Sequence, residues 1–218
     1  MYMIYDSVYV YNAGVISSPF RPVVQTVPGD PAPPAWAGNA GDGSDPFRPK
    51  SDFGDAPATY DPVAVSPAVH ERSEAIRLGA TWTKEWLKTG VTANNDSDDG
   101  TSYVNFLPQG SGNYLAFTYV TNNYGSDATL IAWLDYNGNG VFDASEACAA
   151  QTIPTGTNNV LYWLYWPSFS TPLLNGQTTY MRVRITAATA GMTSAHATGY
   201  FTNGEVEDYP IPVDNYPL

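Results

Sequence analysis

The chain has 218 residues, 43% of them hydrophobic, which is enough for one large domain with its own core. Sixteen Tyr, six Trp and abundant Gly and Pro are typical of an all-β protein with many turns. The formal net charge of −12, with only nine Lys plus Arg, argues against nucleic acid or an anionic membrane surface as a partner. No apolar run reaches the roughly 20 residues needed to span a bilayer.

The chain begins with a segment, residues 1–16, that is rich in Tyr, Val and Ile. Its side chains alternate most strictly from Asp6 to Tyr11, which predicts a β-strand. Residues 17–50 are dense in Pro, Gly, Ala and Asp and are predicted to form an extended linker. We therefore expect an N-terminal strand arm whose candidate subunit contacts are Tyr2, Ile4, Val8 and Val10.

A strand without a partner nearby in sequence exposes backbone donors and acceptors, which is an aggregation hazard unless the strand is paired. The arm can fold back onto its own domain, or it can complete the sheet of a neighbouring subunit. Repeated head to tail, the second arrangement gives an open filament. Both possibilities stay open from the sequence.

Residues 51–218 have the pattern of a compact domain. The charges of residues 69–78 fall on one face, which predicts a short helix there. Strands are predicted farther on, separated by turn signals at residues 122–126 and 175–176, and they cover residues 114–120, 130–134, 160–166 and 180–186. The last of these alternates as a half-buried antiparallel strand does. The predicted fold is an all-β antiparallel β-sandwich, of jelly-roll or immunoglobulin-like type, with an N-terminal extended strand arm.

Residues 135–146 fit the calcium-loop pattern D-x-[DN]-x-[DN]-G-x5-E at every fixed position. Calcium takes oxygen ligands from carboxylates, amides and backbone carbonyls. The candidate ligands are Asp135, Asn137, Asn139, the backbone carbonyl of Val141, Asp143 and Glu146. The preceding run is β-branched and aromatic, so a strand is expected there and not the helix of an EF-hand. The alternative is an Asn-Gly hairpin turn that holds no metal.

A second metal site is predicted where further carboxylates come together. Its candidate ligands are Asp96, Asp98, Asp99, Glu205, Glu207 and Asp208. Glu205 and Glu207 share one face of a strand-like segment, where a cation would offset their repulsion. The alternative for residues 96–99 is a solvated acidic turn.

Four aromatic side chains lie close together at Tyr162, Trp163, Tyr165 and Trp166. They suit a platform on which sugar rings stack. Alternatively, strand alternation buries Tyr162 and Trp166, and the other two cover a sheet face or a subunit contact.

No sequence pattern of nucleophilic catalysis is present, and His70 and His196 lie in unrelated contexts, so no enzymatic activity is expected. Both histidines are expected at the surface or at a cap.

Several motifs of the domain occur in an order that resembles the GEVED domain of secreted and cell-surface bacterial proteins. The family is named for a signature that stands here as Gly204-Glu205-Val206-Glu207-Asp208-Tyr209. The other matching segments are residues 52–57, 70–79, 98–100, 133–140 and 180–185, so the resemblance covers roughly residues 51–213. It implies a β-sandwich in an extracellular setting, without a catalytic activity.

The sequence thus predicts an extracellular, cell-surface structural protein. Its β-sandwich would be stabilised by Ca2+ and would assemble with copies of itself into filaments or a surface matrix. The alternative is a calcium-dependent module that binds surface glycans or mediates adhesion.

Overall fold

The computed structural model describes residues 51–61, 67–71, 73–81, 93, 100–101 and 104–215, and the backbone of three short strands within residues 2–24. Within these residues the helices are two short 3-10 turns, η2 (Ala144–Glu146) and η3 (Ala188–Ala190). Neither described helix is long and apolar enough to cross a membrane.

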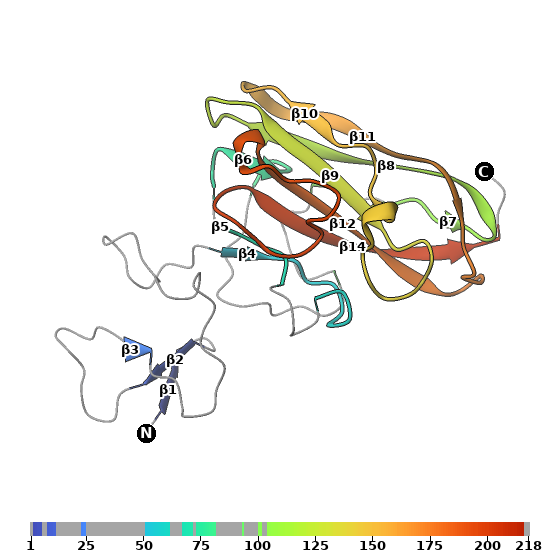
Figure 1. Ribbon diagram of the computed structural model, residues 1–218, viewed down its shortest axis with the longest axis horizontal. Helices are drawn as coiled ribbons and strands as arrows, with labels where there is room; N and C mark the ends of the chain where they lie inside the picture. The colour runs from blue at the N-terminus through green and yellow to red at the C-terminus, as the bar shows by residue number, and fades with distance from the viewer. Residues whose placement is uncertain are drawn as a thin grey trace.

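Two facing sheets make up the body of the protein (Figure 1). The larger has five strands in the order β10 (Gln151–Ile153), β9 (Ala128–Leu134), β12 (Thr178–Ala187), β14 (Glu205–Asp214) and β7 (Leu107–Pro108). The smaller has three, in the order β11 (Thr157–Ser170), β8 (Ser111–Asn122) and β6 (Ile76–Leu78). The pairings are antiparallel except that β7 runs parallel to β14.

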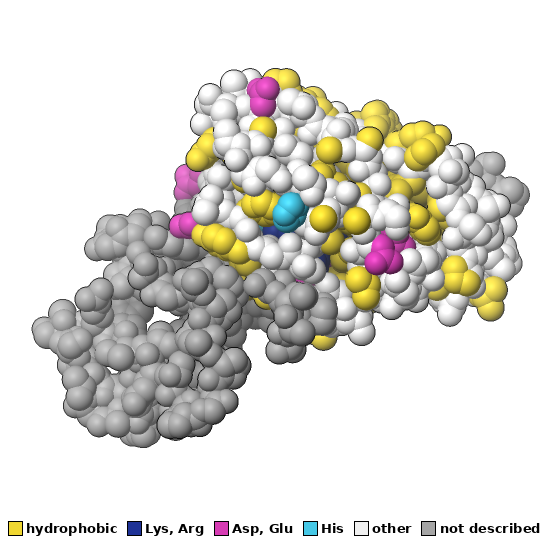
Figure 2. Space-filling model, viewed as in Figure 1, with side chains coloured by type: hydrophobic (Ala, Val, Ile, Leu, Met, Phe, Trp, Pro, Cys, Tyr) yellow, Lys and Arg dark blue, Asp and Glu magenta, His cyan; other side chains and the backbone are white. Residues whose placement is uncertain are grey.

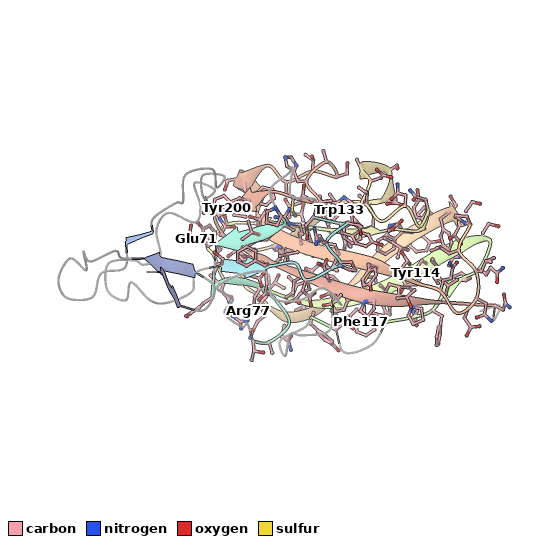
Figure 3. All side chains as sticks on the ribbon, turned by 90° about the horizontal axis from the view of Figure 1, so that it is seen from below. Glu71, Arg77, Tyr114, Phe117, Trp133 and Tyr200 are labelled. Atoms are coloured by element: carbon pink, nitrogen blue, oxygen red, sulfur yellow. The ribbon has the colours of Figure 1, made fainter. Side chains whose placement is uncertain are left out.

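The core lies between these two sheets because alternate residues of each strand point inward. In β9 the inward residues are Leu130, Ala132 and Leu134, and β12 contributes Met181, Val183 and Ile185. From the smaller sheet, Tyr114 and Trp166 pack with ring centroids 5.7 Å apart. Figure 3 shows Tyr114 between the layers, with Trp133 and Phe117 on opposite outer sides. The protein is therefore a β-sandwich, as the sequence predicts.

The other face of the five-stranded sheet is also covered. Ile131 and Trp133 of β9 pack there against residues from the segments that precede and follow the sheet strands, including Tyr60, Phe142 and Phe201. A third small sheet lies in this cover and consists of β13 (Tyr200–Phe201), β5 (Val69–Glu71) and β4 (Ser51–Phe53). The middle strands of the large sheet are consequently buried on both sides.

All four predicted strands of the domain are confirmed, and they correspond to β8, β9, β11 and β12. The predicted half-buried character of residues 180–186 is wrong, since Arg182 and Arg184 on the outer face of β12 are fully buried.

The helix predicted over residues 69–78 is wrong. Its two halves are β5 and β6, which belong to different sheets. Strand pairing explains the difference: Val69 and His70 pair with β13 and β4, and residues 76–78 pair with β8. Partners distant in sequence outweigh the weak helical preference of a short segment.

The N-terminal segment forms strands, but not one unpaired strand. β1 (Tyr2–Tyr5) pairs antiparallel with β2 (Val8–Tyr11), and β2 pairs with β3 (Val23–Val24). The strands thus find partners within residues 2–24. The predicted subunit contacts of Tyr2, Ile4, Val8 and Val10 concern side chains outside the described part of the structure.

Candidate metal centre

The loop predicted to bind calcium joins β9 to η2. β9 ends at Leu134, and Asp135 follows as a carboxylate that is only 1% exposed. Gly138 and Gly140 have φ angles of 70° and 78°, a left-handed conformation that turns the chain sharply. The strand before the loop confirms that this is not an EF-hand helix pair. Figure 2 shows acidic side chains at the surface in the region where Figure 1 places η2.

Asp135 organises the first half of the loop. Its Oδ1 accepts hydrogen bonds from the backbone N–H of Gly138 (2.7 Å) and Asn139 (3.2 Å). Its Oδ2 accepts from the N–H of Gly140 (2.9 Å) and from the hydroxyl of Tyr60 (2.7 Å). Burial raises the pKa of Tyr60, and so does its bond to Asp135, so the phenol stays protonated and donating.

Two asparagine side chains make hydrogen bonds within the middle of the loop. The Oδ1 of Asn137 accepts from the N–H of Asn139 (2.8 Å), and the Oδ1 of Asn139 accepts from the N–H of Val141 (2.9 Å). Both side-chain amides donate to Oδ2 of Asp143, at 3.1 and 2.9 Å. Each asparagine oxygen thus accepts from the N–H two residues farther on, which is the hydrogen bond of an Asx turn.

Glu146 closes the loop and is completely buried. Its carboxylate oxygens accept from the N–H groups of Asn137 (3.2 Å) and Asp143 (3.0 Å). Burial raises the pKa of Glu146 to about 7, and the negative charges of Asp135 and Asp143 add to the rise, although these two N–H bonds oppose it. A divalent cation would favour the ionised form.

The donor set suits a hard cation, because carboxylate, amide and carbonyl oxygens are the ligands calcium prefers. In the stretches that the structure describes, no three or more Asp, Glu, His or Cys side chains are gathered so that they could hold a metal by themselves. The amide oxygens of Asn137 and Asn139 and the carbonyl of Val141 would therefore have to complete the shell with Asp135, Asp143 and Glu146. The loop fits calcium on these terms.

The second acidic segment, residues 204–209, is divided between the two faces of β14. Glu205 pairs with Ile185 in the sheet and Glu207 with Val183, so both carboxylates lie on the sandwich side. Glu205 accepts a hydrogen bond from the N–H of Leu78. Asp208 lies on the opposite face with Arg182. The structure therefore does not bring these three together as one metal site. Asp96, Asp98 and Asp99 lie outside the described residues.

Asp208 instead forms a buried ion pair. Its two oxygens accept from Nε and Nη2 of Arg182 at 2.8 and 2.7 Å. The other edge of the guanidinium donates to both oxygens of Asp61, at 2.7 and 2.8 Å, and to the carbonyl of Ala197 at 3.0 Å. All five N–H groups of Arg182 are thus used, which a fully buried guanidinium requires.

Gly54 packs directly on this ion pair. A Cβ at residue 54 would lie 2.6 Å from Nη2 of Arg182 and 2.7 Å from Oδ2 of Asp208. The motif Asp52-Phe53-Gly54-Asp55 therefore packs against Asp208 of the signature segment, where a side chain at residue 54 would not fit. Asp52 adds to this contact, because its Oδ2 accepts from the N–H of Val206 at 2.6 Å.

Arg184 lies beside Arg182 but has neutral partners. Its Nε donates to Nε2 of His70 at 2.9 Å, and its Nη groups donate to backbone carbonyls. Nδ1 of His70 must then carry the proton, which it donates to the carbonyl of Asn203 at 2.8 Å. Burial lowers the pKa of His70 well below 6.5, and the charges of Arg184 and Arg182 lower it further.

The expected surface position is therefore wrong for His70, which is fully buried, and confirmed for His196, which is exposed. The sequence did not reveal the roles of Arg182, Arg184 and Asp61. One feature of the sequence could have predicted them. Two arginines lie on one face of an otherwise apolar strand, and the signature that follows in the sequence contains three carboxylates.

The aromatic segment of β11 follows strand alternation. Trp166 is buried and its Nε1 donates to the carbonyl of Glu146 at 2.7 Å, while Tyr162 packs against the core. Trp163 and Tyr165 point outward and are 55% and 49% exposed. The four rings therefore do not form one platform.

A family model with the description GEVED domain matches residues 129–212. Comparison with curated proteins and with solved structures gives no match. The matched range begins in β9, contains the whole loop of residues 135–146, and ends in β14 beyond the Gly204–Tyr209 signature. The match is shorter than the range 51–213 expected from the motifs, but the family is the expected one: residues 129–212 match the GEVED domain.

Proposed function

We propose that this protein is a structural, non-catalytic subunit whose β-sandwich is stabilised by one calcium ion in the loop of residues 135–146. It works outside the cell, where free calcium is plentiful, and it assembles with copies of itself into filaments or a surface matrix. The calcium ion would fix the loop between β9 and η2 and, through Trp166, the contact of this loop with the smaller sheet.

The observation that carries the proposal is the charge of this loop. Asp135, Asp143 and Glu146 put three carboxylates into twelve consecutive residues, and Asp135 and Glu146 are buried. Among the residues that the structure describes, no Lys, Arg or His side chain pairs with them. Buried carboxylates without a cation are costly, and a bound divalent ion removes that cost.

The loop is well placed to act as a clamp. Tyr60, from the segment that enters the domain, donates to Asp135, and Trp166 of the smaller sheet donates to the carbonyl of Glu146. Phe142 packs against Tyr60 with ring centroids 4.4 Å apart and lies 5.0 Å from Cζ of Arg182. An ion in the loop would therefore hold three separate parts of the fold in register.

Assembly is proposed to use the N-terminal arm. Strands β1, β2 and β3 pair with one another and with none of the described strands of the two main sheets. An arm of this kind can add to a sheet edge of a neighbouring subunit. It would then be donated as a small sheet and not as the single strand expected from the sequence.

Negative-stain electron microscopy of the purified chain tests the proposal, first with millimolar calcium and then with excess chelator. Regular fibres that weaken when calcium is removed support it, and removal of residues 1–16 should then abolish the fibres without unfolding the sandwich. Discrete particles under both conditions rule out assembly. An unfolding midpoint that does not respond to calcium rules out the clamp.

A further inference from the structure

The outward side of the smaller sheet carries a continuous apolar surface. We call this the outer aromatic face: Leu115, Phe117 and Tyr119 of β8, and Leu161, Trp163 and Tyr165 of β11. The six side chains form three cross-strand rows, because Tyr119 pairs with Leu161, Phe117 with Trp163 and Leu115 with Tyr165. Figure 3 shows Phe117 on this side of the molecule, away from Trp133.

The two strands that carry the face contain no charged residue. β8 and β11 have 12 and 14 residues, and none of them is Asp, Glu, Lys or Arg, although the whole chain has a net charge of −12. On β6, Arg77 pairs with Thr121 and donates to the carbonyls of Glu74 and Ala80. Depletion of charge with enrichment of aromatic residues is the signature of the core of a protein interface.

The ring geometry argues against a sugar platform. Phe117 and Trp163 have ring centroids 5.9 Å apart with planes inclined by 74°, and Phe117 and Tyr119 are inclined by 88°. Neighbouring rings on this face therefore do not present one flat surface to a polysaccharide chain. Ridges of rings set edge to face suit interdigitation with the side chains of another protein surface.

We propose that the outer aromatic face pairs with the same face of a second copy of this chain about a two-fold axis near the Phe117–Trp163 row. This inference deepens the proposed self-assembly and rests on it, and it assigns a contact separate from the N-terminal arm. An isologous contact closes a dimer, so fibres built by the arm would be linked side by side through it.

The available area fits such a contact. With exposures between 37% and 55% for the four most exposed members, the six side chains present roughly 500 Å² of apolar surface. Pairing two faces would bury roughly 1,000 Å² in total, near the lower limit for a specific interface. Two chains of net charge −12 repel one another, and contact through an uncharged surface avoids adding close like-charge pairs to that repulsion. The pairing is therefore expected to be weak and to strengthen as salt screens that repulsion.

Chemical cross-linking of the full chain tests the pairing directly. The native Cys148 is buried, so a new surface cysteine reacts selectively. Packed sheets lie about 10 Å apart, which a short bismaleimide linker spans. Trp163→Cys should give a covalent dimer, whereas Tyr124→Cys, at an aromatic residue of similar exposure on the turn between β8 and β9, should give almost none.

Sedimentation velocity supplies the second readout. Tyr165→Glu should weaken self-association at least tenfold, whereas Tyr124→Glu, whose side chain is 49% exposed like that of Tyr165, should match the wild type. Equal self-association of both variants, or equal cross-linking at both cysteines, overturns the proposal. Loss of binding to a neutral polysaccharide by Tyr165→Glu, with a monomeric wild type, overturns it in favour of a glycan surface. Monomeric wild type that pairs only after removal of residues 1–50 shows instead that the arm covers the face.

The outcome is separable from that of the proposed function. Calcium-dependent stability should be the same in Tyr165→Glu and in the wild type, since neither β11 residue 165 nor its neighbours on the face contact the loop oxygens. If the wild type does not dimerise but calcium still stabilises it, only the pairing of the outer aromatic face is contradicted. If the protein dimerises but calcium does not change its stability, the calcium clamp is contradicted and the pairing of the face stands.

Discussion

Two acidic segments of this domain solve the same electrostatic problem in different ways. In the signature segment, the buried Asp208 is paired with a positively charged side chain. Arg182 donates two hydrogen bonds to Asp208 and two more to Asp61. In the loop of residues 135–146, Asp135 and Glu146 are equally buried, but from the described residues they receive only neutral N–H and O–H donors. The first segment has its counter-charge within the chain, and under the proposed function the second would receive its counter-charge from a dissolved calcium ion.

The comparison separates stability that the chain supplies by itself from stability that would depend on bound calcium. An ion pair made within the chain is present under all conditions, so it stabilises the fold whether calcium is present or not. A loop that depends on a dissolved ion is stable in proportion to the concentration of that ion. Disruption of the first should therefore destabilise the domain in any buffer, and disruption of the second should destabilise it only when calcium is present.

The largest effect is expected for Arg182→Met. The substitution leaves Asp61 and Asp208 buried without their cation, which costs about 3–5 kcal/mol of the free energy of unfolding. Urea unfolding in excess chelator measures it, with Arg77→Met as the matched control at an exposed arginine. Equal stability of both variants would contradict the role given to the ion pair.

Gly204→Ala is expected to follow. Gly204 has a φ of 100°, and an added Cβ would lie 1.9 Å from the backbone oxygen of Ile185 and 2.9 Å from Nδ1 of His70. Because backbone cannot yield as a flexible side chain does, we expect a loss on the order of 3 kcal/mol. Gly156→Ala is the control, since it also has a positive φ but nothing within 4 Å of the new Cβ. A similar loss in both variants would show that strain alone, and not the close approach, fixes Gly204.

Glu146→Gln should abolish stabilisation by calcium. With calcium at about 100 times its Kd, the wild type gains about 2.7 kcal/mol, which the variant lacks. Without calcium, we do not expect the wild type to be the more stable of the two proteins. The pKa of Glu146 is raised to about 7 from 4.5, so ionisation lowers the stability of the metal-free wild type as the pH rises through that interval.

In chelator at pH 8 the variant should thus be at least as stable as the wild type. Thermal unfolding with and without calcium checks both signs. A variant that is less stable in chelator, with an unchanged response to calcium, would contradict the assignment of Glu146.

The smallest expected effect is a dependence on pH at His70. Its pKa in the folded protein lies well below 6.5, so the unfolded chain takes up a proton first as the pH falls. Stability is retained above pH 6.5 and is lost below it, by up to about 1.4 kcal/mol for each pH unit over which the native imidazole stays neutral. Urea unfolding from pH 7.5 to 5 measures the slope, and His70→Gln should flatten it. An unchanged slope in the variant would assign the effect to other groups.

What the sequence could predict depends on how far apart the interacting residues lie. The strands show their own alternation and could be predicted directly, and the loop whose calcium binding is proposed has its candidate ligands within twelve consecutive residues. The contacts on the outer face of the five-stranded sheet could not be predicted from the sequence. Arg182 meets Asp61 across 121 positions and His70 meets Asn203 across 133, and no local pattern links them.

The same limit explains the two errors in secondary structure. Residues 69–78 are too short to distinguish helix from strand by periodicity, and their partners on β13 and β8 lie far along the chain. The pairing of β1 with β2 was missed because the sequence between Tyr5 and Val8 contains no glycine turn signal.

Isothermal titration calorimetry of the chelator-stripped protein with calcium tests the central claim most directly. We expect saturable binding at one loop site in the wild type and in Arg77→Met, and its loss in Glu146→Gln. If the wild type and Glu146→Gln titrate alike, or if neither binds calcium up to millimolar concentrations, the loop is a metal-free turn and the clamp does not exist.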